Sequence, residues 1–152
     1  MSRRKAREAA LQMLFQIDIG KNEWQAAEYT LEESQLQEVN AEFSRQVVKG
    51  AIENLADIDK LINHYAQDWS VDRLVNVDKT ILRLAIYELL HMDTPYRIII
   101  NEAVELAKIF GGDDSGAFVN GLLDALCNNE TVLKENSERY NEFKGFAEAP
   151  GK

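Results

Sequence analysis

Apolar residues recur at helical spacing along most of the chain. Gly20 is expected to end the first helical segment, and Asp57 is expected to cap a later one at its N-terminus. The polar residues 23–38 are expected to form a long connection with some helix. Because side chains three and four positions apart share a helix face, the spacing predicts three helices in this half, at about residues 3–19, 43–55 and 57–66.

The second half opens with a segment, residues 77–92, whose apolar side chains cover most of a helix circumference. A helix that is apolar nearly all round is a buried, central one. The sequence Asp93-Thr94-Pro95 is expected to end it, because proline disfavours helical backbone in the residue before it. The isoleucines at 98–100 have no partner strand and are expected to form a packed connector.

Helical spacing returns over residues 101–110, and Gly111-Gly112 is expected to end that helix. Asp113, Asp114 and Ser115 are three successive N-cap candidates for the next helix, and a last polar helix is expected over 130–140. Six or seven helices with short loops predict an all-α fold, a compact bundle.

Length and composition favour one cytoplasmic domain. A chain of 152 residues is long enough to bury a core. The lone cysteine, Cys127, fits a reducing compartment. No apolar run approaches the roughly 20 residues of a membrane span, and polar residues interrupt any signal peptide at the N-terminus. We therefore expect no membrane association.

Positive charge is concentrated at the start of a chain whose formal net charge is −9. Without Arg3, Arg4, Lys5 and Arg7 the remainder would carry about −13, so acidity elsewhere would confine a polyanion to this site. In a helix Arg3, Arg7, Leu11 and Phe15 lie four apart, along one line. Guanidinium groups clamp phosphates, and an aromatic ring can stack on a base. The alternatives are a merely solubilising basic end, and core packing for Phe15.

Catalytic chemistry has little support in the sequence. His64 and His91 lie in separate helices without metal-ligand spacing, and Cys127 follows an apolar stripe typical of a structural thiol. Asp113-Asp114 are better explained by helix capping than as paired catalytic carboxylates. We therefore expect no enzyme activity, no metal and no cofactor.

Several motifs together resemble the bacterial transcription antitermination factor NusB family. The resemblance covers roughly residues 3–127 and is most specific in the second half. The motifs that carry it are Arg3-Arg4-Lys5-Ala6-Arg7-Glu8, Leu82-Arg83-Leu84-Ala85-Ile86-Tyr87-Glu88-Leu89, Ile100-Asn101-Glu102-Ala103-Val104-Glu105-Leu106-Ala107-Lys108 and Phe118-Val119-Asn120-Gly121-Leu122-Leu123-Asp124.

The resemblance implies two three-helix subdomains, about 1–68 and 69–140, with a tail at 141–152. It implies an RNA-binding factor for ribosomal RNA operons that does not act as an enzyme. Such factors bind the single-stranded boxA element of nascent RNA together with NusE, a small-subunit ribosomal protein. The pair joins an antitermination complex on RNA polymerase.

The resemblance also implies roles for individual residues. Arg3, Arg4, Lys5 and Arg7 would contact RNA phosphates, with Phe15 on the same helix. The turn after residue 110 resembles a second RNA-contacting region, with Phe110, Asp114 and Phe118; core packing is an equal alternative for Phe118. The NusE surface would include Asp78.

Two other functions stay open beside antitermination. One is an RNA-recruitment module related to the domain fused to some RNA cytosine methyltransferases. The other is a helical protein–protein adaptor whose basic N-terminus docks an acidic partner. Lys5 stands where an arginine is common, which keeps the charge but weakens bidentate recognition. Self-association as a homodimer that hides the RNA face is a further possibility.

Overall fold

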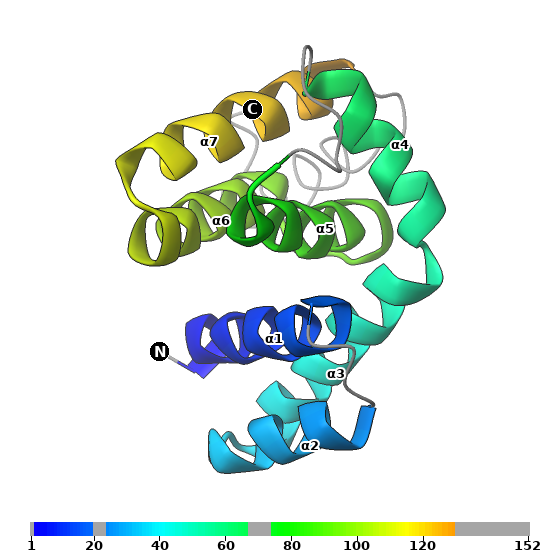
Figure 1. Cartoon of the computed structure of the whole chain (residues 1–152), viewed down its shortest axis with the longest axis vertical. Helices are drawn as coiled ribbons and strands as arrows, with labels where there is room; N and C mark the ends of the chain where they lie inside the picture. The colour runs from blue at the N-terminus through cyan, green and yellow to red at the C-terminus, as the bar shows by residue number, and fades with distance from the viewer. Residues whose placement is uncertain (1, 20–23, 67–73, 130–152) are drawn as a thin grey trace, which may run out of the picture.

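The computed structural model describes residues 2–19, 24–66 and 74–129, and this part of the chain contains helices and no strand (Figure 1). The all-α fold class is thereby confirmed. The helices are α1 (Ser2–Ile19), α2 (Trp24–Glu33), α3 (Glu38–Glu53), α4 (Leu55–Tyr65), α5 (Asn76–His91), α6 (Tyr96–Gly111) and α7 (Asp113–Asn129).

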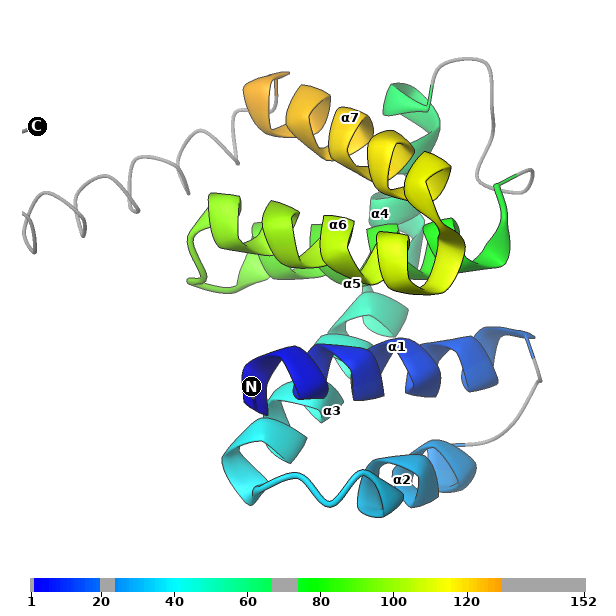
Figure 2. The ribbon, with the colours of Figure 1, turned by 90° about the vertical axis from the view of Figure 1, so that its left-hand side faces the viewer.

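The helices form two layers, which Figures 1 and 2 show from two sides. In the first layer α1 packs against α2 and α3. In the second layer α6 packs against α5 and α7, and α4 packs against α5 and α7 at one end. The layers meet where α1 and α3 contact α5. The helices thus fall into two sets, with α4 added to the three helices α5–α7; the subdomain boundary near residue 68 stays a prediction.

Helix α5 is central, as its apolar pattern predicts. Apolar side chains on several of its faces are at most 1% exposed, including Ile81, Leu82, Ile86 and Leu89. Its polar residues Arg83 and Glu88 are also buried. Burial of a charged group demands a partner, and the two residues find theirs on α4 and α1 respectively.

Three local predictions are wrong. The first concerns the N-cap of α7: because this helix begins at Asp113, the candidates Asp113, Asp114 and Ser115 all lie inside it. The other two concern the connector at 98–100 and the cap at Asp57. The isoleucines 98–100 belong to α6, which begins at Tyr96 directly after Pro95. Because Ile99 and Ile100 are buried while Ile98 is 47% exposed, these residues form the apolar edge of an amphipathic first turn rather than a connector. Asp57 does not cap α4; the helix begins at Leu55 after Asn54, and Asp57 lies within its first turn.

The break between α6 and α7 follows the predicted glycines. Gly111 is the last residue of α6, and Gly112 adopts φ = 93° and ψ = 180°. That conformation is essentially confined to glycine. It reverses the chain at once, so that α7 packs back along α6.

Two expectations lie outside the described residues, the polar helix at 130–140 and the tail at 141–152. Among the described helices none is both long and apolar enough to cross a membrane.

Candidate nucleic-acid interface

The predicted line of residues on α1 runs along the contact between the two layers. Its ends are accessible, since Arg3 is exposed and the Phe15 side chain is 37% exposed. Its middle is covered, since Arg7 and Leu11 are buried. The four residues are therefore aligned as predicted, and the two ends of the line are more accessible than its middle.

Arg7 is held inside the layer contact by Glu88 of α5. Its Nε donates to Glu88 Oε1 over 3.2 Å, and its Nη2 donates to Glu88 Oε2. Arg7 is 9% exposed and Glu88 is 3% exposed. Removing either partner would leave an uncompensated buried charge. Arg7 thus joins α1 to α5, and its guanidinium is occupied.

Arg4 makes a similar pair at the surface, with Glu102 of α6. Its Nε and Nη2 donate to the two carboxylate oxygens over 2.9 and 2.8 Å. The Arg4 side chain is 45% exposed and that of Glu102 is 19% exposed. The hydrogen bonds from Arg4, and then its charge, hold the pKa of the Glu102 carboxyl below its usual value, and the same bonds raise the pKa of Arg4.

Arg3 and Lys5 complete the basic cluster. The Arg3 guanidinium carbon lies 4.3 Å from the centroid of the Phe43 ring, and that of Arg7 lies 5.1 Å from it. Both Arg3 and Lys5 are exposed. Within the described part of the chain neither pairs with a carboxylate, so these two residues carry the uncompensated positive charge of the cluster.

The three arginines line a groove of about 690 Å³ between the layers. Its volume is within the range of small-molecule sites. The arginines and Phe43 contribute from the first layer, and the end of α5, the following loop and the start of α6 contribute from the second. The remaining lining residues are Gln46, His91, Met92, Asp93, Thr94, Ile98 and Glu102.

A second, smaller depression of about 340 Å³ lies toward the other end of α1. It brings together Phe15 and Phe110, which lie on different layers, and Val77 at the start of α5 contributes to it. Phe110 is 43% exposed, so both rings offer an accessible surface. This depression is mainly apolar, unlike the groove lined by the arginines.

The other predicted residues near the α6–α7 turn do not join this depression. Asp114 is exposed in the first turn of α7, on the far side of the break at Gly112. Phe118 is half-buried and packs against the core, which agrees with the alternative given for it. The turn therefore separates Phe110 from Phe118 rather than continuing one helical face.

Asp78 is buried in the first turn of α5, where the helix dipole favours a carboxylate. It is 7% exposed, and its Oδ1 atom has no hydrogen-bond donor among the described residues. Such an atom is costly unless a donor reaches it. Its neighbour Val77 lines the apolar depression.

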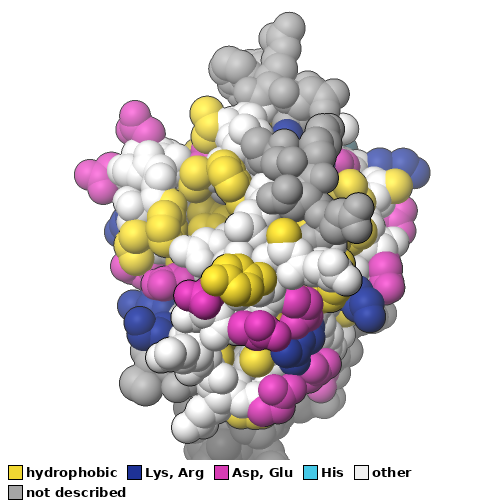
Figure 3. Space-filling view, turned by 60° about the horizontal axis from the view of Figure 1, so that its bottom comes forward, with side chains coloured by type: hydrophobic (Ala, Val, Ile, Leu, Met, Phe, Trp, Pro, Cys, Tyr) yellow, Lys and Arg dark blue, Asp and Glu magenta, His cyan; other side chains and the backbone are white. Residues whose placement is uncertain are grey.

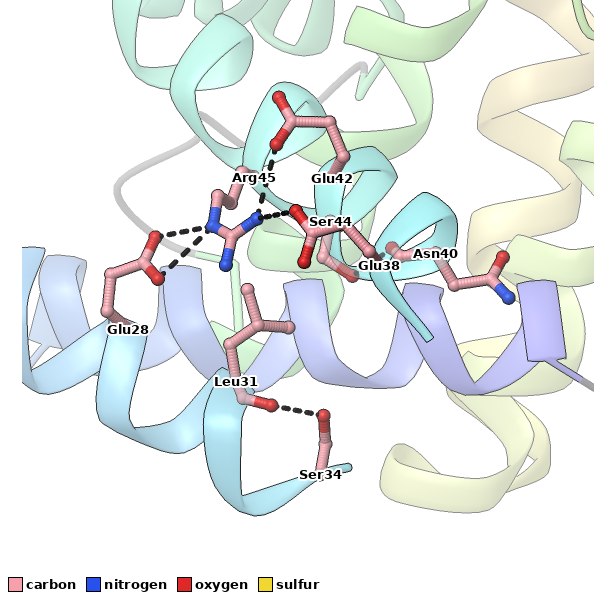
Figure 4. A network of polar contacts seen from close by, with 8 residues as sticks. All are labelled: Glu28, Leu31, Ser34, Glu38, Asn40, Glu42, Ser44 and Arg45. Carbon is pink, nitrogen blue, oxygen red and sulfur yellow. Dashed lines mark hydrogen bonds and ion pairs between the residues drawn. The ribbon is translucent and has the colours of Figure 1, made fainter. Parts of the chain in front are cut away.

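Elsewhere in the first layer, Arg45 is compensated by several carboxylates. Arg45 of α3 donates to Glu28 of α2 and to Glu38 and Glu42 of its own helix, as Figure 4 shows. These partners raise the pKa of Arg45. On the face in Figure 3 basic side chains likewise appear in small groups beside acidic ones, without a broad basic patch.

The sequence reasoning missed several residues of the groove, chiefly Phe43, Gln46, Asp93 and Thr94. They come from one helix, α3, and from the loop between α5 and α6, which are distant in the chain, and none lies in a recognisable nucleic-acid motif. Glu102 lies in a family-like motif, but its pairing with a residue 98 positions away has no local signal.

Comparison with known proteins gives a consistent result. The NusB family model matches residues 4–128. The transcription antitermination protein NusB of Pelotomaculum thermopropionicum is 47% identical over 126 residues, 81% of this chain and 87% of the relative. That of Desulforamulus reducens is 46% identical over 132 residues, 86% of this chain and 92% of the relative.

Solved structures agree with this result. NusB of T. maritima superposes with a TM-score of 0.79 at 40% identity, over 91% of this chain and 98% of that chain. A chain from the crystal structure of antitermination factors NusB and NusE in complex with dsRNA superposes with a TM-score of 0.78 at 26% identity. That match covers 85% of this chain and 98% of the other.

Proposed function

The chain belongs to the NusB family of transcription antitermination proteins, and on that premise we propose that it binds the boxA element of nascent ribosomal RNA together with NusE. In this proposal the pair joins the antitermination complex on RNA polymerase. The protein acts by binding, without catalysis. The solved complex of NusB and NusE with dsRNA, to which this chain is similar, supports both partners.

The observation that carries the proposal is the pair of uncompensated cations at the start of α1. Arg3 and Lys5 are both exposed, on a protein of net charge −9, and Arg3 also lines the groove between the layers. Phosphate contacts supply much of the affinity of RNA-binding proteins. Arg3 and Lys5 would bind phosphates directly, whereas Arg7 would act by fixing α1 on α5.

The apolar depression supports a second contact with RNA. Phe15 and Phe110 present partly exposed rings on either side of the layer contact, and exposed aromatic rings stack on unpaired bases. Asp114 is exposed nearby in sequence and would accept hydrogen bonds from base amino groups. Phe118 would support this region mainly from the core.

The NusE surface is proposed around Asp78. Its unpaired Oδ1 is buried in this conformation, so the start of α5 would have to shift for a basic partner to donate a hydrogen bond to it; ribosomal proteins are usually basic. Replacing Asp78 with Asn should weaken NusE binding while leaving RNA binding by the free protein largely unchanged. Titration of NusE by calorimetry, beside RNA titration of the same variant, separates the two effects.

The main test is fluorescence anisotropy with a short single-stranded boxA-like RNA and a scrambled control. Measurements at physiological salt, with and without NusE, should show preference for boxA and tighter binding with NusE. Replacing Arg3 with Gln should weaken binding to both RNAs and reduce the magnitude of the salt slope by about 0.7. The matched control is Lys60→Gln, an exposed lysine on α4.

Two results would contradict the proposal. One is equal, weak binding of both RNAs that NusE leaves unchanged, which would favour the protein–protein adaptor. The other is an equal effect of the Arg3 and Lys60 substitutions. Sedimentation of the same samples with and without RNA would show whether a homodimer competes with RNA binding.

A further inference from the structure

The groove lined by Arg3, Arg4 and Arg7 carries less uncompensated positive charge than three arginines in the sequence suggest. Arg7 is neutralised by Glu88 behind it, and Arg4 is neutralised by Glu102. Asp93 lies on the opposite wall, which adds another negative charge. In this state the groove would attract a phosphate only through Arg3. A stronger site requires that one of the paired arginines exchange its partner.

The two ion pairs differ in their capacity for such an exchange. The Arg7–Glu88 pair is buried, so separating it would leave two charges without a partner in the protein interior. The Arg4–Glu102 pair is partly exposed, with the Arg4 side chain 45% accessible. Exposed pairs contribute little net stability, because water solvates the separated groups. Only Arg4 can change partners at small cost.

The geometry of the exposed pair is that of phosphate recognition. Glu102 presents two oxygens to the Nε and Nη2 atoms of Arg4 at 2.9 and 2.8 Å. Arginine binds the oxygens of a phosphodiester with the same two-pronged arrangement. Arg3 lines the same groove and is held against Phe43, so a second guanidinium lies ready for the same strand.

We propose that Glu102 takes the place of an RNA phosphate on Arg4 in the free protein, and that a phosphodiester entering the groove displaces it. The inference rests on the proposed RNA-binding function and deepens it. It assigns the groove as the site of one backbone phosphate, with Arg3 and Arg4 as its ligands. It also makes Glu102 an internal competitor that lowers RNA affinity.

The test is RNA affinity of Glu102→Gln, measured by anisotropy with the boxA-like and scrambled RNAs at physiological salt. We expect binding to tighten about two- to fivefold, the range expected for loss of an exposed competing carboxylate. Both RNAs should gain by the same factor, because a phosphate contact carries no base information.

Glu105→Gln is the matched control. Glu105 lies one turn further along α6 and acts on Arg4 through its charge, without hydrogen bonds to it. The substitution therefore changes the net charge equally but leaves the Arg4–Glu102 pair intact. A gain for Glu102→Gln that exceeds this control, and that disappears when Arg4→Gln is added, is the expected result.

Other outcomes overturn the inference. Equal gains for the two glutamate variants would reduce the effect to general electrostatics, and a gain that persists without Arg4 would remove Arg4 from the site. Thermal unfolding of each variant verifies that the folded protein is being compared. If the wild-type protein shows no preference for boxA, the proposed function itself fails; if it keeps that preference while Glu102→Gln shows no excess gain, only the competitor role fails.

Discussion

Charged residues that look alike in the sequence have different roles in the fold. Arg3, Arg4 and Arg7 lie within five consecutive positions of one helix, yet one stacks on a ring, one pairs at the surface and one pairs in the interior. The difference arises from the neighbouring helices, since α5 and α6 each supply a glutamate at a different depth. The contribution of each arginine to binding and to stability should differ accordingly.

Replacing Arg7 with Gln should lower the free energy of unfolding by about 3–5 kcal/mol, because Glu88 would remain buried without its cation. Urea unfolding followed by circular dichroism measures this change. Arg4→Gln, which breaks the exposed pair, is the control and should cost much less. Equal losses for the two variants would contradict the distinction between a structural and an exchangeable arginine.

Cys127 should react slowly with alkylating agents in the folded protein. Burial, and secondarily the charge of Asp124, raise the pKa of its thiol to about 12. Because the thiolate is the nucleophile, little of the reactive form exists at pH 8. Iodoacetamide labelling followed by mass spectrometry should be at least about tenfold slower than in urea-unfolded protein. Equal rates would show that the thiol is accessible and ionisable.

At the scale of the elements, a helix is positioned by its own apolar pattern and by contacts with helices distant in the chain. Helix α4 illustrates this, because its apolar stripe buries Ile58 and Ile62 while Asp59 pairs with Arg83 of α5 at 2.8–2.9 Å. The pairs α5–α6 and α6–α7 are joined by very short connections. Backbone conformation in those connections therefore decides how the helices meet.

The Gly112 break should be sensitive to substitution. An added Cβ meets no atom within 4 Å, so the cost of Gly112→Ala comes from its φ of +93° alone. We expect a loss of about 1–3 kcal/mol in the free energy of unfolding. Gly121→Ala is the matched control: it also has open space, but it lies within α7, where alanine is favoured by about 1 kcal/mol. Destabilisation by both variants would argue against a backbone cause.

The sequence predicts the helices better than it predicts the site. Apolar periodicity predicted the central helix α5, and the pair Gly111-Gly112 predicted the end of α6. Both predictions succeed because they depend on local spacing and on the backbone preference of glycine. Apolar periodicity failed at Ile98–Ile100, because a run of β-branched residues does not look helical by itself. In the structure α6 already begins at Tyr96 and includes this run. The pairing of Arg4 and Arg7 with glutamates 98 and 81 positions away depends on how the layers meet, which no local pattern encodes.

On the scale of the whole molecule, the two layers are joined by apolar contacts and by ion pairs that also shape the candidate site. Arg7–Glu88 and Arg4–Glu102 both run from α1 to the second layer. Exchange of Glu102 for an RNA phosphate would therefore remove one link between the layers while adding a ligand beside it. Stability and RNA affinity would then be coupled through this residue.

Lowering the pH should weaken the Arg4–Glu102 ion pair between the layers. Hydrogen bonds from Arg4 lower the pKa of the Glu102 carboxyl in the folded protein. The ion pair therefore stabilises the fold fully above the pKa of the unfolded chain, about 4.3. This stabilisation is lost as the pH falls through the lower pKa of the folded protein. The difference in unfolding free energy between wild type and Glu102→Gln should therefore be constant from about pH 7 to 5 and shrink below about 4.3. Urea unfolding at a series of pH values, with Glu105→Gln as control, measures it. A difference that does not change down to about pH 3 would mean that Arg4 does not depress the pKa of Glu102, and the link would then rest on packing alone.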